Sequence, residues 1–450
     1  MVYYLNFIYY TNNLEIYREK YMKKIVNLEF YKKNRGADNI TLTIGIFLFR
    51  FLLDISYYKL IGPIFEYSGF RYSFNFSRYI LSIFILMIFI PIIIRLNRKV
   101  SFSRITITVL VYISLVPFTT MVAFYDFEIN FVIQFVIYWL ILLITYLLFP
   151  KLKLVEIKKE KITDFVLKVI IFLFFITIIF ISWRYTGFRI TLDIFNVYDL
   201  RSEASSFKIP TLLSYIYAAS KMINPVLIVY YMSIKKYKMT SFIVLIQLLS
   251  FSINGSKTVF FSTVLSIILY WIYNNRYILR LPWLLALIPF IGGIEYYIMK
   301  SYNIVNFIIR RVFFVPNLLN YYYYDFFSKN TPDYLKQSFL RHFGIESSYP
   351  PIDNLIGELY FNKPNMGANN GLFSEAYSNF GSLGLFIMPF IIVFAFKILD
   401  ACAEGLDSRI FIVSSCILAF IFISSFFFTI LLTHGFIALC LILIFLPRKT

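Results

Sequence analysis

Long apolar runs, each about the thickness of a membrane, occupy most of this chain. Most are about 17–22 residues long, the length at which a helix crosses a bilayer core of roughly 30 Å. Hydrophobic residues make up 60% of the chain, charged residues only 15%, and the mean hydropathy is +0.73. This composition excludes a soluble domain, so we expect an all-α polytopic integral membrane protein with about 12 transmembrane helices. We place the spans at 40–61, 79–95, 106–124, 130–149, 165–183, 211–232, 241–254, 258–274, 281–298, 381–399, 409–426 and 430–447.

The basic residues indicate how these spans are oriented. The formal net charge is +19, and in a membrane protein Lys and Arg collect in the cytoplasmic connections. With twelve spans, every basic cluster falls on one side, which predicts cytoplasmic termini and a basic cytoplasmic tail at 1–39. The charge therefore indicates orientation, and we expect no nucleic-acid partner. The clusters are the tail, 95–104, 151–161, 235–238, 276–280 and 448–449.

Two longer segments interrupt the apolar pattern on the opposite, extracytoplasmic side. The first, 184–210, lies within the block of nine predicted helices at 40–298, and the second, 299–380, precedes the last three helices at 381–450. A loop as long as the second is uncommon unless it has a function. We expect it to contain short helices and to cap an active site.

The predicted outer segments carry several arginines. The ordinary explanation is solvation and attraction to lipid headgroups; the alternative is convergence on a phosphate-bearing ligand, because the arginine fork matches phosphate oxygens. A tight turn, Asn254–Gly255–Ser256–Lys257, joins two predicted spans. Lys257 either extends its ammonium to the membrane surface or binds an anion. The arginines are Arg184, Arg189, Arg201, Arg310, Arg311 and Arg341.

Other ionisable residues lie within the predicted spans. Arg50 and Asp54 are four residues apart, so they share a helix face and can form an ion pair. Lys221 is expected to extend outward, and His434 to be a hydrogen-bonded packing residue. The run Tyr321–Tyr324 is either an interfacial aromatic belt or a platform for sugar rings.

Several chemistries find no support in the sequence. The chain has no phosphate-binding glycine loop, no cluster of Cys and His suited to zinc, and no channel-filter motif. The arginines, His342 and a few carboxylates of the outer segments remain. They suit a metal-free glycosyl transfer from a lipid diphosphate, in which cations stabilise the leaving group and a base accepts the proton of a sugar hydroxyl.

Three motifs carry a resemblance to a known family. The segment Gly367–Gly384, directly followed by an apolar span, looks like the end of the large outer loop in O-antigen polymerases (the Wzy, or oligosaccharide repeat unit polymerase, family). The turn Asn254–Lys257 is similar to a motif between two central spans of that family, although Lys257 stands where Arg is common. Arg201-Ser-Glu-Ala also resembles the family, so the likeness covers about 185–400.

The resemblance implies a fold and an activity. Such polymerases have a GT-C-like architecture in the bacterial cytoplasmic membrane and need no metal or cofactor. They join polyprenyl-diphosphate-linked oligosaccharide repeat units into a surface polysaccharide, whether O-antigen, capsule or exopolysaccharide. Membrane lipids, a flippase and a chain-length regulator are the implied partners.

Roles for individual residues follow as expectations. Arg189, Arg201, Lys257 and Arg310 or Arg311 would bind the diphosphate. Arg341 and His342 would lie near the reacting centre, and Glu375 would assist catalysis. The alternative is that His342 is a surface or packing residue and Glu375 an interfacial carboxylate.

Two other functions stay open. An O-antigen ligase would share the late outer loop and the basic residues. A flippase for the same lipid-linked unit would also fit twelve spans, but it should show two similar halves with polar residues spread through the spans. The chain shows no such halves.

Overall fold

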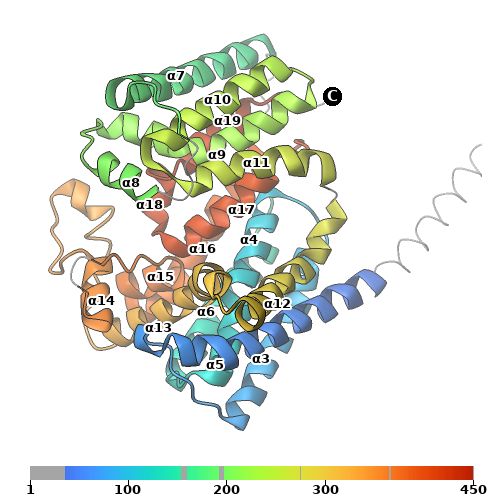
Figure 1. Cartoon of the computed structure of the whole chain (residues 1–450), viewed down its shortest axis with the longest axis vertical. Helices are drawn as coiled ribbons and strands as arrows, with labels where there is room; N and C mark the ends of the chain where they lie inside the picture. The colour runs from blue at the N-terminus through green and yellow to red at the C-terminus, as the bar shows by residue number, and fades with distance from the viewer. Residues whose placement is uncertain (1–35, 154–159, 192–196, 274, 364–365, 449–450) are drawn as a thin grey trace, which may run out of the picture.

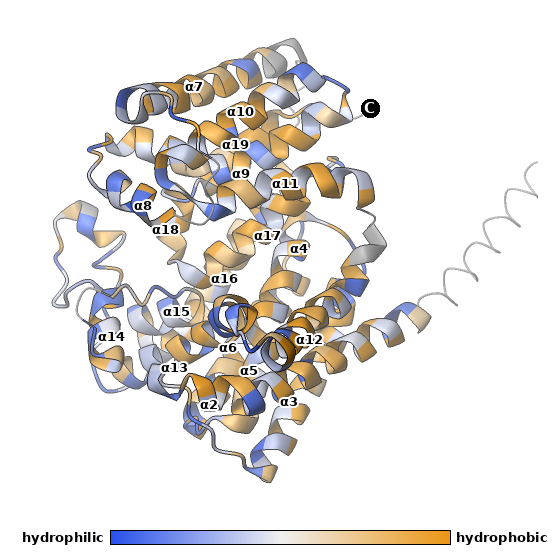
Figure 2. Cartoon of the chain, in the orientation of Figure 1, coloured by the Kyte–Doolittle hydropathy of each residue, from blue (hydrophilic) through white to orange (hydrophobic). Residues whose placement is uncertain are grey.

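The computed structural model describes residues 36–153, 160–191, 197–273, 275–363 and 366–448. These residues form helices joined by turns and loops (Figure 1). The predicted tail 1–39 lies outside the described residues except for its last four, and so does Lys449. Apolar residues run along the helices, whereas hydrophilic residues gather in connections and at helix ends (Figure 2).

Within the described residues, eight helices are long and apolar enough to cross a membrane, which confirms a polytopic membrane protein. Each overlaps one of the twelve predicted spans. They are Gly36–Ile64, α3 (Phe76–Leu96), Phe102–Phe124 (α4, η3 and α5), α6 (Ile129–Leu148), Phe165–Thr186 within α7 (Glu160–Thr186), α9 (Thr211–Ser233), Ile278–Met299 including α12 (Leu281–Met299), and Phe373–Cys402.

The other four predicted spans are shorter or more polar helices. Three of them are α10 (Tyr237–Asn254), α11 (Lys257–Ile272) and α17 (Ser408–Ser424). The last predicted span is divided into α18 (Phe427–Leu432) and α19 (Phe436–Phe445). The division falls at Gly435, whose φ of +79° is incompatible with a continuous helix.

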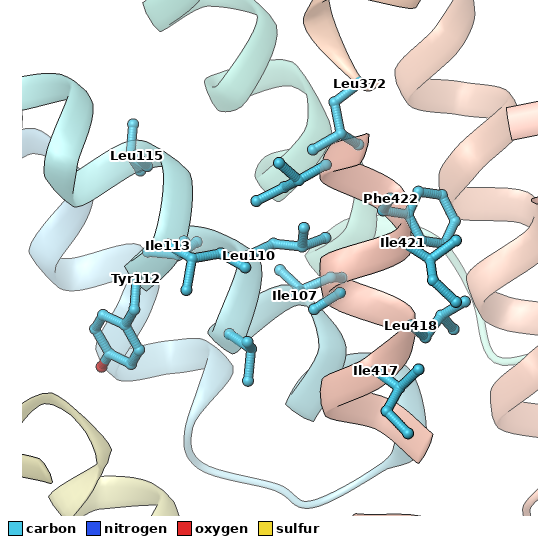
Figure 3. Packing of buried hydrophobic residues seen from close by; sticks show 14 of the residues in the cluster. Ile107, Leu110, Tyr112, Ile113, Leu115, Leu372, Ile417, Leu418, Ile421 and Phe422 are labelled. Atoms are coloured by element: carbon cyan, nitrogen blue, oxygen red, sulfur yellow. The ribbon is translucent and has the colours of Figure 1, made fainter. Parts of the chain in front are cut away.

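Helix α17 lies at the centre of the bundle. It packs against α9, which in turn packs against α7, α10, α11 and α19, and on its other side against α4 (Phe102–Leu110). Figure 3 shows this second contact, with Ile107 and Leu110 of α4 directed toward the helix that carries Ile417 and Leu418. Helix α17 therefore joins α9 and its neighbours to α4 through buried apolar contacts.

One end of the bundle, here called the basic end, gathers the basic connections. The Asp400 carboxylate accepts hydrogen bonds from Ser103 (N–H, 2.9 Å) and Tyr146 (hydroxyl, 3.0 Å). Arg448 donates to the Cys402 carbonyl at 2.6 Å, and the Arg409 guanidinium lies over the Tyr270 ring. These contacts place the connections after α3, α6 and α16 (Gly384–Cys402) beside the end of α19.

The opposite end, here called the loop end, gathers the predicted outer segments. Ser73 donates its N–H to the Phe124 carbonyl at 2.9 Å, which brings the end of Gly36–Ile64 beside the end of α5 (Val116–Phe124). The rings of Tyr302 and Phe65 are 6.0 Å apart, so α12 also ends here.

The segment 299–380 is largely helical. A bent helix, η5 (Val305–Phe314) followed by α13 (Val315–Phe327), begins beside Glu295, whose carboxylate accepts from the Asn303 N–H at 3.0 Å. Its middle enters the bundle, where Asn317 donates to the Ser114 carbonyl at 3.1 Å. It ends at the α5–α6 turn, where the Tyr324 hydroxyl donates to Glu128 at 3.3 Å. Both ends of this helix therefore lie at the loop end.

Shorter helices complete the segment. The chain continues through η6 (Leu340–Phe343), α14 (Ile352–Phe361), α15 (Phe373–Phe380) and η7 (Gly381–Leu383) into α16.

Candidate functional site

A short helix in the first predicted outer segment, α8 (Val197–Ser205), packs on the Asn254–Lys257 turn. Gly255 closes α10 with a φ of +62°, and a Cβ built on it would lie 3.0 Å from the Val197 Cβ and 3.2 Å from the Leu200 Cβ. The Thr191 N–H also donates to the Ser252 hydroxyl at 2.9 Å. The sequence indicated the turn but gave no sign that α8 packs on it.

This packing sets the segment that carries two predicted diphosphate-binding residues, Arg189 and Arg201, against the turn that carries a third, Lys257. Arg201 lies in α8, and the exposed Lys257 is the first residue of α11. Arg189 donates to Glu203 of α8 at 2.7 Å, and its buried Nε has no hydrogen-bond partner among the described residues. The first turn of α11 adds backbone N–H groups and the positive end of a helix dipole, a combination that attracts anions.

The other two predicted diphosphate-binding residues lie elsewhere. Arg310 donates to Asn306 at 2.7 Å and its guanidinium lies 4.8 Å from the centre of the Phe65 ring. Arg311 lies over the Phe307 ring. Both residues belong to η5, and these contacts are with Asn306, Phe65 and Phe307 rather than with α8 or α11.

Arg341 lies in η6, within a loop of residues 331–350 that hydrogen bonds hold in place. Asp333 anchors one side: its N–H donates to the Ser378 carbonyl at 2.8 Å, and its carboxylate accepts from the Gln337 N–H at 2.9 Å. The Gln337 amide then donates to the Pro350 carbonyl at 2.7 Å. Arg341 is exposed, whereas the side chain of His342, in the same turn, lies outside the described residues.

Glu375, the predicted catalytic carboxylate, is only 1% exposed. One of its oxygens accepts the Phe427 N–H at 2.7 Å, and the other has no partner among the described residues. The adjacent Phe428 ring contacts the Phe339 ring of the Arg341 loop at 6.0 Å. The structure thus joins Glu375 and the Arg341 loop at the start of α18, with the Glu375 carboxylate enclosed.

The segment resembling the polymerase loop is bound tightly into the bundle. Asn370 donates to Asn320 at 2.9 Å and to the Ser374 hydroxyl at 2.8 Å, and all three side chains are buried. The Gly371 N–H donates to the Ile423 carbonyl at 2.7 Å. The polar residues of this segment were visible in the sequence, but their partners on α13 and α17 are far away in the chain.

The tyrosine run is mainly a packing element. Tyr322, Tyr323 and Tyr324 are buried, and Tyr322 stacks on Tyr360 with ring centres 4.3 Å apart. The next residue, Asp325, accepts from Tyr360 at 2.6 Å and pairs with Lys329 at 2.5 Å. Burial raises the pKa of Asp325, but the hydrogen bonds from Lys329 and Tyr360 and the charge of Lys329 outweigh it, so the pKa lies below its usual value.

The ionisable residues noted within the predicted spans have polar partners. The predicted Arg50–Asp54 pair is confirmed, and Arg50 also donates to Thr119 at 2.8 Å and Ser82 at 2.9 Å. Lys221 lies 2.9 Å from Nδ1 of His434, so it has a partner that the sequence did not indicate.

No protein-family model, curated protein or solved structure matches this chain. The function must therefore be argued from the residues of the chain itself.

Proposed function

We propose that this protein polymerises polyprenyl-diphosphate-linked oligosaccharide repeat units at the outer face of a bacterial cytoplasmic membrane. The chain would be a metal-independent, GT-C-like glycosyltransferase with twelve spans. It would transfer the growing glycan from its lipid carrier to the non-reducing sugar of a fresh unit and release the polyprenyl diphosphate. A flippase would supply the units, and a chain-length regulator would act on the product.

One observation carries this proposal: α8 packs on the Asn254–Lys257 turn. It sets the outer segment that carries Arg189 and Arg201 against the turn that carries Lys257, at the ends of α10 and α11. A lipid diphosphate has its charge at this same level, directly above an apolar chain. Cations held there stabilise the negative charge that develops on the leaving diphosphate.

The basic end supports the orientation. The basic connections after α3 and α6 lie at the basic end, opposite the loop end, as expected if they face the cytoplasm. Under the proposal, the cluster of Arg189, Arg201 and Lys257 then faces outward, where lipid-linked repeat units are joined.

Residues that lie apart from this cluster have other roles in the proposal. Arg341 lies on an anchored loop and would contact the glycan or the diphosphate from the other side. Glu375 would act indirectly, because its carboxylate binds the Phe427 N–H and so fixes the start of α18. Arg310 and Arg311 would stabilise η5 rather than bind the leaving diphosphate.

The experiment is a glycan analysis of the bacterium that carries the gene. Deletion should remove long surface chains and leave single repeat units attached to their final acceptor. Loss of all surface glycan would instead indicate a ligase or a flippase, and unchanged long chains would overturn the proposal.

Site variants then test the cluster. Arg201→Ala and Lys257→Ala should each shorten the chains strongly at normal protein level. Lys208→Ala is the matched control, because Lys208 follows α8 in the same outer segment without belonging to the proposed cluster. Normal chain length in both cluster variants would show that the diphosphate binds elsewhere.

A transporter of lipid-linked units is the second candidate, favoured by one specific observation. The break between α18 and α19 contacts Ala219, well inside α9, and broken helices within the membrane are typical of transporter binding sites. A transporter would lose all surface glycan on deletion, so the same experiment separates the two functions.

A further inference from the structure

A row of three hydrogen-bonded polar side chains connects α9 with the helix break near the loop end. Nζ of Lys221 lies 2.9 Å from Nδ1 of His434, and Nε2 of His434 lies 2.9 Å from the Ser425 hydroxyl. Lys221 belongs to α9, Ser425 to the α17–α18 turn, and His434 to the α18–α19 break. Three separate segments thus contribute one residue each.

Lys221 lies inside α9, one of the helices that are long and apolar enough to cross a membrane. At 1.5 Å per residue, Lys221 is about 15 Å along α9 from its first residue. Helix α19 has 10 residues and so covers only about half of a bilayer core. Gly435 makes the break possible by packing directly on Ala219 with a φ of +79°. Irregular backbone and an ionisable pair at this depth are costly, and usually mark a functional site.

The start of α18, directly after Ser425, contacts both Glu375 and the loop that carries Arg341. Phe427, two residues after Ser425, donates its N–H to Glu375 at 2.7 Å. Phe428 contacts Phe339 of the Arg341 loop. The chain of polar groups is therefore adjacent to the residues that we place around the reacting centre.

Several carboxylates near the loop end are poorly placed to accept a proton from a substrate. Glu375 is 1% exposed and Asp333 only 2%. The carboxylate of Asp333 accepts from Gln337 and Ser347, and that of Asp325 from Tyr360 and Lys329. In contrast, the Ser425 side chain belongs to a residue that is only partly buried.

We propose that Ser425, His434 and Lys221 form the proton relay that accepts the hydroxyl proton of the acceptor sugar. This inference rests on the proposed polymerase function and assigns its base. Ser425 contacts the acceptor hydroxyl, whereas His434 and Lys221 are positioning residues that act through Ser425.

The relay has two complete hydrogen-bonding states. With Lys221 as a neutral amine, Nδ1–H of His434 donates to Nζ, and the Ser425 hydroxyl donates to Nε2. With Lys221 as an ammonium, Nζ donates to Nδ1, and Nε2–H donates to the Ser425 oxygen. The second state holds one more proton than the first, and every contact is satisfied in both.

Glycosyl transfer supplies that proton. The acceptor oxygen forms a bond to the anomeric carbon while the bond from that carbon to the diphosphate oxygen breaks, and its electron pair leaves with the diphosphate. The acceptor proton passes to Ser425, the Ser425 proton to Nε2, and the Nδ1 proton to Lys221. The positive charge gained at Lys221 balances the negative charge gained by the diphosphate. The proton returns through the relay to the diphosphate as it is released, which leaves Lys221 as a neutral amine.

The experiment uses the full-length purified protein in lipid vesicles, with lipid-linked single repeat units extracted from the deletion strain as substrate. Ser425→Ala, His434→Gln and Lys221→Met should each reduce kcat by about 100-fold, the usual contribution of a positioned proton acceptor. The KM for the lipid-linked unit should stay within about threefold, because the diphosphate contacts are unchanged.

Lys221→Arg separates a relay from a simple positive charge. Arginine keeps the charge and can donate to His434, but it cannot be deprotonated in a protein. The relay therefore predicts that Lys221→Arg is as slow as Lys221→Met. A rate within about threefold of wild type in Lys221→Arg or in His434→Gln would overturn the relay.

Ser424→Ala is the matched control, because among the described residues the Ser424 hydroxyl bonds only within its own helix, to the Phe420 carbonyl at 2.9 Å and the Ile421 carbonyl at 3.5 Å. This variant should polymerise at the wild-type rate. A variant that affects only folding should also show the wild-type rate when the rate is expressed per molecule of folded protein. Absence of polymer with the wild-type protein would instead contradict the proposed function, a result distinct from normal rates in the relay variants.

Discussion

Arg50 and Asp54 place an ion pair inside the helix bundle, with side chains only 4% and 8% exposed. Their four-residue spacing was enough to predict the pair from the sequence. The network around them was not predictable, because Ser82 and Thr119 lie on other helices and polar residues of that size occur throughout the spans. Lys221 shows the same limit, since its partner His434 is far away in the chain.

Asp54→Ala should destabilise the protein by about 3–5 kcal/mol, because it leaves the Arg50 guanidinium buried without its counter-charge. Thermal unfolding in detergent measures the effect. Asp126→Ala is the matched control: it removes the partner of Arg78 in a pair whose side chains are 31% and 73% exposed. Such a pair contributes about 0–1 kcal/mol, so equal losses in the two variants would contradict this account.

At the scale of elements, periodicity and length predicted where helices occur but not how they end or pack. The only proline of the predicted span 430–447 is Pro447, at its last position, yet the helix breaks at Gly435, which packs against Ala219. The segment 299–380 was predicted as an outer loop with short helices. Its long bent helix was missed, since Arg310, Arg311 and several Asn residues lower its hydropathy.

Gly255→Ala tests the packing of α8 on the α10–α11 turn. The added Cβ would lie 3.0 Å from the Val197 Cβ, so α8 must give way by a few tenths of an ångström, which should disturb the arrangement of Arg201 and Lys257. Gly187→Ala is the control, since Gly187 has a similar φ of +56° but nothing within 4 Å of the added Cβ. Both variants lose about 1–2 kcal/mol through backbone strain, but only Gly255→Ala should shorten the glycan chains. Equal chain lengths would show that this packing does not serve polymerisation.

Gly371→Ala tests how firmly the Gly367–Gly384 segment must pack. A Cβ at this position would collide with the backbone oxygens of Phe422 and Ser425, which cannot move without shifting α17. We expect a loss of at least about 1–3 kcal/mol, typical of overpacking. Gly293→Ala, in α12 with nothing within 4 Å of the added Cβ, should be neutral or stabilising because alanine favours helix. Similar melting temperatures for both variants would contradict the close packing.

At the scale of the whole molecule, the two ends of the bundle differ in character. The basic end carries the Lys- and Arg-rich connections, and the loop end carries the long segments with buried polar contacts. The sequence predicted this division from charge and loop length, because both are visible without tertiary structure. The convergence of particular residues at the loop end required the packing of α8, α13 and α18, which no local pattern encodes.

Cysteine labelling tests the orientation. In a chain whose native Cys402, Cys416 and Cys440 are replaced by Ala, Lys257→Cys and Arg341→Cys should react with a membrane-impermeant maleimide added to intact cells. Lys153→Cys and Lys236→Cys, exposed at the basic end, should react only after lysis. The reverse pattern would place the proposed site in the cytoplasm and contradict the assigned orientation.

The most direct measurement of the central claim is a reconstitution of the purified protein in vesicles with lipid-linked single repeat units as the only substrate. The account predicts a ladder of glycans that differ by one repeat, with one polyprenyl diphosphate released for each bond formed. Movement of the units across the vesicle membrane without any ladder would show a transporter, and would contradict the assignment of this chain as a polymerase.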